Sequence, residues 1–439
     1  MPSPLYKAFE TMTYPDTYYS RTAIDVSQRP SLTETLSADV CIIGGGLAGL
    51  SCAQELINRG KSVVVLESRR VAWGASGRNG GFVTAGFAGG EELAEQRLGM
   101  TGAKQLFDLS REGVDIVRNN IQTLNLKETS PSPGKISVIR YHDPDSLQRY
   151  CDKMARDYGH ELTYLSKADL PDYMNTDRYH QGYLDNQGFH FHPLNYCLGL
   201  ARVIEQRGGK IFEDCEVLSM DQDSPVKSVT TARGKVNAQD IVLCGGGYSG
   251  KVFDKVRRSL LPITTYVVVT EKIGPLLQEC IKTGAAILDD RMASDYYRIV
   301  DEDRLLWGGR VTTRTSEPKD LAALLRQDML DVYPALAGVK IETAWSGLMA
   351  YARHKMPYIG EIKPGVWTCT AFGGHGMNTA PIGGRLIAEA ITGESSRYKL
   401  FKAFDLQWNG GPAGPLVAQS VYWGLKLTDW WNERKSVTR

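Results

Sequence analysis

A glycine-rich turn between two apolar runs constrains the fold more than any other feature of the chain. The run Val40-Cys41-Ile42-Ile43 leads into Gly44-Gly45-Gly46-Leu47-Ala48-Gly49, and a second apolar run ends at Glu67. This spacing is typical of a strand–turn–helix–strand unit that binds a dinucleotide. Gly44 makes the tight turn, Gly46 lets the backbone approach a pyrophosphate, and Gly49 lets the helix pack on the sheet. We expect Glu67 to accept hydrogen bonds from a ribose hydroxyl.

Composition narrows the class of protein. A length of 439 residues exceeds the usual size of a single core, so we expect two packed domains. The net charge of +1 and the lack of a long basic stretch argue against a nucleic-acid partner. Eight cysteines without metal-binding spacing are expected to be reduced core thiols. The chain shows neither a secretory pattern near residue 1 nor 18 consecutive apolar residues, so we expect a cytoplasmic protein.

Further glycine-rich segments follow along the chain. The loop Gly74-Ala75-Ser76-Gly77-Arg78-Asn79-Gly80-Gly81 permits close approach of a flat or anionic group. A predicted strand over 240–244 ends in Gly245-Gly246-Gly247-Tyr248, and another over 366–371 precedes Gly373-Gly374-His375-Gly376-Met377-Asn378. Periodicity predicts helices over 91–126, 193–208, 320–332 and 381–392, a strand near Val217, and an antiparallel layer over 262–343.

These segments together resemble one known family. The 44–49 turn with Glu67, the 74–81 loop, the 244–249 segment and the 373–378 segment are similar to the flavin-dependent amine and amino-acid oxidoreductases typified by D-amino acid oxidase and glycine oxidase. The form of the 74–81 loop, the Pro15-Asp16-Thr17-Tyr18-Tyr19 arm and the Trp-rich tail look most similar to gamma-glutamylputrescine oxidase-like members. The resemblance covers nearly the whole chain.

The resemblance implies an α/β fold (α+β, two domains) with a Rossmann-like FAD-binding domain and a discontinuous antiparallel-sheet substrate domain. It divides the chain into an arm (1–36), FAD-binding parts (37–88, 186–262 and 344–405), substrate parts (89–185 and 263–343) and a helical tail (406–439). The implied contacts to FAD come from Gly44, Gly46, Leu47, Ala48, Gly49, Glu67, Ser68, Ser76, Gly77, Arg78, Asn79, Gly80, Gly81, Val217, Gly245, Gly246, Tyr248, Gly374, His375, Gly376, Met377 and Asn378.

The same resemblance frames the expected chemistry. A helix that starts after 375–378 directs its free amides toward the pyrimidine edge of the flavin, where negative charge develops on reduction. An amine must be neutral to release its electrons, so an aromatic-lined pocket favours reaction. The residues that we expect to serve catalysis are His375, Tyr296, Arg298 and Trp345, and the wider set of candidate lining residues adds Tyr248, Tyr297 and Trp307. His375 has an alternative role as a cap of its turn.

Several positions depart from the family. Gly376 and Met377 stand near the place where glycine oxidase carries an arginine that binds the substrate carboxylate, so an amino-acid substrate would need Arg298 or Arg353 instead. Arg78 either reaches the flavin or a substrate carboxylate, or only holds its loop. The 351–357 segment lacks the cysteine that binds FAD covalently in sarcosine oxidases, so we expect non-covalent FAD. The 305–307 segment lacks the lysine with which they activate oxygen.

The resulting hypothesis is an FAD-dependent amine oxidase that acts on a primary or secondary amine, including gamma-glutamylputrescine or a related polyamine derivative, and produces hydrogen peroxide. The alternative is an FAD-dependent amino-acid or N-methyl amino-acid dehydrogenase with another electron acceptor, and a flavin-binding protein without turnover is a third possibility. A metal site at His190 and His192 has no third ligand nearby, so none is expected. The tail over 415–439 is expected to pack on the body or on a second subunit rather than on a membrane, and the oligomeric state stays open.

Overall fold

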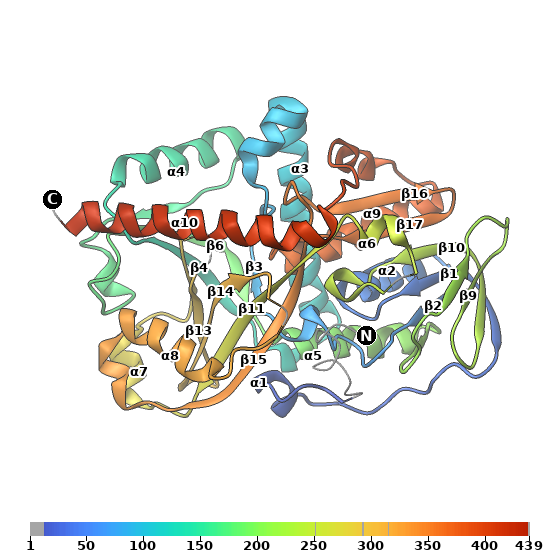
Figure 1. Cartoon of the computed structure of the whole chain (residues 1–439), viewed down its shortest axis with the longest axis horizontal. Helices are drawn as coiled ribbons and strands as arrows, with labels where there is room; N and C mark the ends of the chain where they lie inside the picture. The colour runs from blue at the N-terminus through green and yellow to red at the C-terminus, as the bar shows by residue number, and fades with distance from the viewer. Residues whose placement is uncertain (1–12, 251, 292–293, 315, 438–439) are drawn as a thin grey trace.

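Two sheets and the helices between them form the body of the molecule. The computed structural model describes residues 13–250, 252–291, 294–314 and 316–437. One sheet lies on the right of Figure 1 and the other on the left, and the chain crosses between them several times. The predicted α/β fold with a Rossmann-like domain and a second, largely antiparallel sheet is confirmed.

The first sheet is built around parallel strands. Its spatial order is β16-β17-β10-β1-β2-β7, in which β16 alone runs antiparallel to its neighbour, and the β8–β9 hairpin extends β10. Residues 40–42 of β1 and the whole of β2 are buried and apolar, because both faces of the sheet are covered there. The strands are β1 (Thr35–Ile43), β2 (Val63–Leu66), β7 (Lys210–Phe212), β8 (Ser219–Asp221), β9 (Lys227–Thr230), β10 (Lys235–Leu243), β16 (Tyr358–Lys363) and β17 (Val366–Thr370).

The second sheet has the order β15-β11-β14-β13-β12-β4-β6-β3, with β5 paired to β6. Its pairs are antiparallel except for β12 and β4, which are parallel. It comprises β3 (Phe82–Val83), β4 (Ser132–Ile139), β5 (Thr163–Leu165), β6 (Gln181–His190), β11 (Leu261–Thr270), β12 (Ala286–Asp289), β13 (Tyr296–Val300), β14 (Arg304–Thr312) and β15 (Ile341–Tyr351). Since β15 continues to 351, the second sheet extends past the predicted boundary at 343. The division into seven segments remains a prediction.

The helices cover the sheets and join them. Helix α3 bends at Gly99, whose φ of 67° is non-helical, and packs against α9. The predicted helices are found, although α9 starts five residues before the predicted 381 and contains Pro381. The helices are α1 (Tyr18–Arg21), α2 (Leu47–Asn58), α3 (Gly90–Thr123), α4 (Pro144–Tyr158), α5 (Pro193–Gln206), α6 (Asp254–Arg257), α7 (Pro275–Cys280), α8 (Leu321–Val332), α9 (Gly376–Thr392) and α10 (Gly414–Val437).

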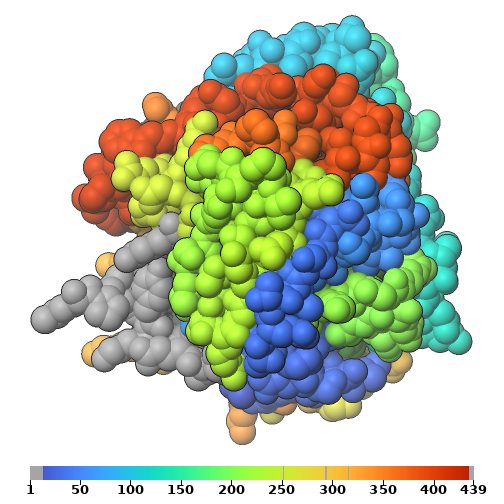
Figure 2. Space-filling view, turned by 90° about the vertical axis from the view of Figure 1, so that its right-hand side faces the viewer, coloured from blue at the N-terminus to red at the C-terminus, as the bar shows by residue number. Residues whose placement is uncertain are grey.

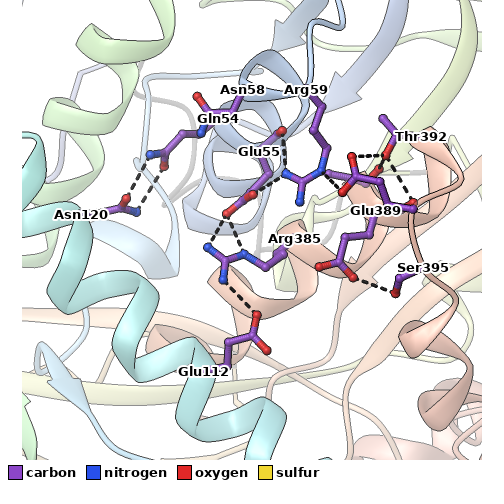
Figure 3. A network of polar contacts seen from close by, with 12 residues as sticks. Gln54, Glu55, Asn58, Arg59, Glu112, Asn120, Arg385, Glu389, Thr392 and Ser395 are labelled. Atoms are coloured by element: carbon purple, nitrogen blue, oxygen red, sulfur yellow. Dashed lines mark hydrogen bonds and ion pairs between the residues drawn. The ribbon is translucent and has the colours of Figure 1, made fainter.

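A network of ion pairs fixes α2, α3 and α9 relative to one another (Figure 3). Arg385 of α9 binds Glu55 of α2 at 2.9 Å and Glu112 of α3 at 2.9 Å. Glu112 also pairs with Arg397, at 2.6 Å. Because α9 begins at the glycine-rich 373–378 segment, this network sets the position of the helix start as well as the packing of the core.

Two aromatic residues considered as pocket lining lie elsewhere. Tyr297 and Trp307 are fully buried and stacked, with ring centroids 4.3 Å apart, in a core on one side of the second sheet. The Tyr297 hydroxyl lies 3.2 Å from that of Tyr179 and 3.1 Å from that of Tyr333. Side chains alternate between the faces of a strand, so Tyr297 points away from its neighbours Tyr296 and Arg298. The expectation that Tyr297 and Trp307 line the pocket is therefore corrected.

Candidate functional site

The turn between β1 and α2 has room for backbone only. A Cβ at Gly49 would lie 2.0 Å from the Gly44 carbonyl oxygen, and one at Gly46 would lie 2.9 Å from Ser76 Oγ. Gly44 itself has a φ of +112°. Helix α2 begins after Gly46 without a side-chain cap, and the Leu47 amide donates to Ser76 Oγ at 2.9 Å. The turn and the 74–81 loop therefore meet at this helix start.

Glu67 lies at the end of β2 and braces the same turn. Its Oε2 accepts the Gly45 amide at 2.7 Å and its Oε1 accepts the Arg69 amide at 2.8 Å. Burial raises the pKa of Glu67, while these amide bonds oppose the rise. Ser68 is exposed beside it, and Val217 is buried two residues after Cys215, whose amide donates to the Glu67 carbonyl at 2.9 Å. Glu67 thus shapes the turn in addition to its predicted contact with ribose.

The 74–81 loop runs beneath aromatic rings. A Cβ at Gly80 would lie 2.8 Å from the Tyr296 ring, and one at Gly74 would lie 2.9 Å from the Tyr248 ring. Asn79 holds the loop from inside: its Nδ2 donates to the Ser76 carbonyl at 2.9 Å, and its Oδ1 accepts the Gly81 amide at 2.7 Å. Glycine is required here because the backbone touches ring faces.

Arg78 is buried at the centre of this loop. Its Nε donates to the Trp73 carbonyl at 2.8 Å, its Nη1 donates to the Ser346 carbonyl at 3.3 Å, and its guanidinium lies 4.2 Å from the Trp73 ring centroid. Its Nη2 is buried without a hydrogen-bond partner among the described residues. Trp345 donates its indole N–H to the Arg78 carbonyl at 2.9 Å. Arg78 therefore holds its loop and still has one buried donor available.

Every nitrogen of the Arg298 guanidinium group already contacts a neighbouring group. Its Nε donates to the Gly80 carbonyl at 2.7 Å, and its Nη2 donates to the Phe191 carbonyl at 3.0 Å and lies 3.1 Å from the Tyr19 hydroxyl. Its Nη1 lies 3.1 Å from His190 Nδ1. A bidentate bond to a substrate carboxylate would require most of these contacts to break. These contacts hold the 74–81 loop against β13, and the catalytic role of Arg298 stays a prediction.

The amino-terminal arm contributes to the site, which sequence reasoning missed. Tyr19 of α1 is fully buried between Arg298, the His192 ring at a centroid distance of 4.9 Å, and the Trp345 ring at 5.8 Å. His192 caps α5 by accepting the Asn195 amide at 3.1 Å, and so it does not share a strand face with His190. The described residues contain no group of three potential metal ligands. The run of proline and tyrosine residues over Pro15–Tyr19 was the sequence signal that could have indicated a role for the arm in the site.

Helix α9 begins beside the segment that follows the 74–81 loop. His375 is its N-cap residue and makes no side-chain capping bond, so the first amides of α9 have no side-chain cap. Burial lowers the pKa of His375 to about 4, and the Lys135 cation adds to this effect. A Cβ at Gly374 would lie 3.5 Å from the hydroxyl of Tyr351, a residue that the sequence did not single out. Asn378 donates to the Gly86 carbonyl at 3.0 Å, which ties the helix to the segment after the loop.

The remaining predicted residues divide between the site and the surface. Tyr248 accepts the Leu348 amide at 3.1 Å, and Gly245 and Gly246 form the turn that carries it. A Cβ at Gly77 would lie 2.4 Å from the Ala72 carbonyl oxygen, so only glycine fits there. Arg353, the second candidate for a carboxylate contact, is exposed.

These features fit a bound dinucleotide. Helices α2 and α9 both start without a capping bond from the side chain of their N-cap residue, although Ser76 Oγ accepts the Leu47 amide of α2. The α2 turn leaves no space for side chains, and Arg78 Nη2 is a buried donor without a partner among the described residues. Uncapped helix starts favour anionic groups, because their free amides carry partial positive charge. The fold and the site define a dinucleotide-binding protein. Its cofactor site, formed by the β1–α2 turn and the 74–81 loop, lies against aromatic side chains of the second sheet.

The chain belongs to the FAD-dependent oxidoreductases of the DAO family, whose model, described as FAD dependent oxidoreductase, matches residues 39–390. It is 32% identical over 418 residues to the probable oxidoreductase OrdL of Haemophilus influenzae, with 94% of this chain and 93% of that protein covered. It is 31% identical to the gamma-glutamylputrescine oxidoreductase of Escherichia coli, with 88% and 90% covered. The glycine oxidase structure from Geobacillus kaustophilus shares the fold, with a TM-score of 0.72 at 19% identity over 85% of this chain and 99% of that one.

Family membership establishes an FAD-dependent oxidoreductase. Relatives that the chain matches are named for oxidation of gamma-glutamylputrescine or glycine. The predicted family, enzyme class and cofactor are thereby confirmed. The part of the chain that the structure describes contains no helix long and apolar enough to cross a membrane. The individual site residues remain predictions, now with the positions given above.

Proposed function

We propose that the protein oxidises a primary or secondary amine, of the gamma-glutamylputrescine type or a related polyamine derivative, to an imine that water converts to a carbonyl compound. The observation that carries this proposal is the engagement of Arg298 by Gly80, Phe191, Tyr19 and His190. With Arg353 exposed, two of the arginines considered for an amino-acid carboxylate are unsuited to that role. The 31% identical relative named gamma-glutamylputrescine oxidoreductase supports the same substrate class.

The surroundings of the loop suit a neutral amine. When bound, FAD supplies the acceptor for two electrons. Tyr296, Trp345 and Tyr248 surround the 74–81 loop with weakly polar surface, which disfavours an ammonium ion and lowers the pKa of a bound amine from the range near 10.4 typical of lysine. His375 is neutral at pH 7 because its pKa is about 4. The uncapped amides of α9 are therefore the groups that favour negative charge on the bound cofactor.

Oxygen is the proposed electron acceptor, with hydrogen peroxide as the product, and FAD is proposed to be held without a covalent bond.

A second candidate function has one specific observation in its favour. Arg78 Nη2 is a buried, unpartnered donor, and it offers a single hydrogen bond to a carboxylate. This would suit an amino-acid or N-methyl amino-acid dehydrogenase that uses another acceptor.

Anaerobic reduction followed by air distinguishes the two functions. We expect gamma-glutamyl amines or polyamines to bleach the flavin of the purified protein, and air to restore the oxidised spectrum quickly with release of peroxide. Bleaching by amino acids with slow reoxidation would replace the proposal with the dehydrogenase. Arg78→Lys tests the anchor: it should raise KM for a carboxylate substrate far more than for an amine without one, and Arg353→Lys is the matched control.

A further inference from the structure

The carboxy-terminal helix α10 is docked on the body through its polar side. Gln419 Oε1 accepts hydrogen bonds from Thr312 Oγ1 and from the Thr313 amide, both at 3.1 Å. Glu433 pairs with Arg178 at 2.6 Å. Asp429 also lies on this inner side, where burial raises its pKa and the nearby Arg291 opposes the rise. The contacts that hold α10 are thus hydrogen bonds and ion pairs.

The outer side of α10 is apolar, which is the reverse of an ordinary surface helix. Figure 1 shows the helix lying across the face of the molecule, and Figure 2 shows the dark red carboxy-terminal segment at the left edge of the body. The exposed fractions of its large apolar residues range from 48% to 72%. The stripe consists of Leu416, Val417, Val421, Trp423, Leu427, Trp430 and Trp431, and the exposed Trp408 precedes it.

The stripe is continuous along the helix. Residues 417, 421, 424, 428 and 431 form one row at helical spacing, and 416, 420, 423, 427 and 430 form the adjacent row. Neither row contains an acidic residue. The 24 residues of α10 span about 36 Å at 1.5 Å per residue. The apolar surface is therefore an extended band rather than a group of scattered side chains.

Exposed cations lie near the stripe. On α10 itself, Lys426 stands midway along the helix, 5.8 Å from the Tyr422 ring centroid, and Arg434 lies near the carboxy-terminal end. At the start of the stripe, the Asn409 amide donates to the Arg258 carbonyl at 2.8 Å, which places α6 beside the stripe. There Lys255, Arg257 and Arg258 are exposed together with a single acid, Asp254.

We propose that this stripe docks on the surface of an anionic phospholipid bilayer, with α10 lying in the plane of the interface. Tryptophan and leucine partition into the boundary between headgroups and acyl chains, and the bordering cations attract anionic headgroups. A second copy of the chain fits less well. A parallel or an antiparallel pairing of two α10 helices would bring cationic ends against cationic ends. The association is peripheral, because no described helix is suited to span a bilayer.

Sedimentation with vesicles tests the proposal on the full-length, FAD-loaded protein. We expect binding to vesicles of phosphatidylcholine and phosphatidylglycerol in equal parts at low salt, and weaker binding to pure phosphatidylcholine or in high salt. Leu427→Glu should reduce binding to the mixed vesicles about tenfold or more, because it places an acid in the stripe. Leu218→Glu is the matched control: Leu218 is 61% exposed outside the stripe, and its variant should bind like the parent.

Two results would overturn the proposal. One is absence of binding to the mixed vesicles by protein that retains its flavin spectrum. The other is a concentration-dependent dimer that Leu427→Glu dissociates while vesicle binding stays absent or unchanged, which would assign the stripe to a second copy. Quenching of tryptophan fluorescence by brominated phospholipids gives an independent readout: it should occur in the parent and fall in Trp423→Ser. Flavin content reports whether each variant is folded.

Discussion

The two sheets contribute to the candidate site in different ways. The first sheet contributes backbone: the turn after β1 and the start of α9 present amides, and glycines exclude side chains. The second sheet contributes side chains, with Tyr296 and Arg298 from β13 and Trp345 from β15 placed over the 74–81 loop. The cofactor cradle is thus set by local chain geometry, and the substrate side by the register of distant strands.

The largest expected effect comes from filling the turn of the first sheet. Gly49→Val should yield protein without bound FAD and with a free energy of unfolding lower by about 3 kcal/mol or more, because its Cβ would start 2.0 Å from the Gly44 carbonyl oxygen. Flavin absorbance and thermal unfolding measure both effects. Gly338→Val is the control, since no atom lies within 4 Å of the position of its Cβ. Full flavin content in Gly49→Val would refute the close approach.

The next effect tests the second sheet's hold on the loop. Arg298→Met should lower the free energy of unfolding by about 3 kcal/mol, because buried carbonyl groups of Gly80 and Phe191 lose their donor, and flavin retention should fall with it. Urea unfolding and flavin content are the measurements. Arg353→Met, at an exposed arginine, should leave both unchanged. If instead Arg298→Met kept its stability and lost only turnover of carboxylate substrates, Arg298 would be the anchor that its contacts argue against.

The difference between a backbone-built first sheet and a side-chain-built second sheet explains which parts of the site the sequence could predict. The β1–α2 turn and the predicted helices follow from local spacing and periodicity, and the structure has them at or near the predicted positions. Strands β4 and β6 and helix α4 were not predicted, and the strand expected near Val217 begins at Ser219.

The sequence could not predict which side chains of β13 face the 74–81 loop. Tyr296 and Tyr297 are adjacent aromatic residues, and the pairing of β13 with β12 and β14 decides which of them contacts the loop. Tyr19 was missed because its contact partners are about 170 to 330 residues away in the sequence. The predicted helix over 381–392 was too short because proline usually marks a helix start, whereas Pro381 lies inside α9.

A pH experiment probes the junction between the two sheets. Burial lowers the pKa of His192 to about 3, and the nearby Arg298 cation contributes. Between pH 6.5 and 3 the His192 imidazole therefore binds a proton in the unfolded chain but not in the folded protein, so the free energy of unfolding falls as the pH falls. His192→Asn keeps an acceptor for the Asn195 amide and removes this titration. It should reduce the loss of unfolding free energy between pH 7 and pH 4 by about 3 kcal/mol.

Urea unfolding of parent and variant at pH 7 and pH 4 measures that difference. His142→Asn is a suitable comparison, because His142 belongs to the loop after β4 and its ring centroid lies 6.3 Å from that of His180 rather than at the cap of α5. An equal acid sensitivity in parent and His192→Asn would show that the folded protein accommodates the imidazolium. The arm would then be less tightly closed over α5 than the contacts of Tyr19 and Thr22 with His192 indicate.

The smallest effect separates two roles of Glu67. Its carboxylate braces Gly45 and Arg69, and it is also the predicted partner of the ribose. Glu67→Ala should weaken FAD retention about tenfold or more without unfolding the protein, whereas Glu67→Gln, which keeps an acceptor oxygen, should weaken it less. Equilibrium dialysis of FAD measures this. Undiminished retention in Glu67→Ala would refute the ribose contact, and equal losses in both variants would show that the negative charge, rather than the bracing of the turn, determines how the first sheet holds its cofactor.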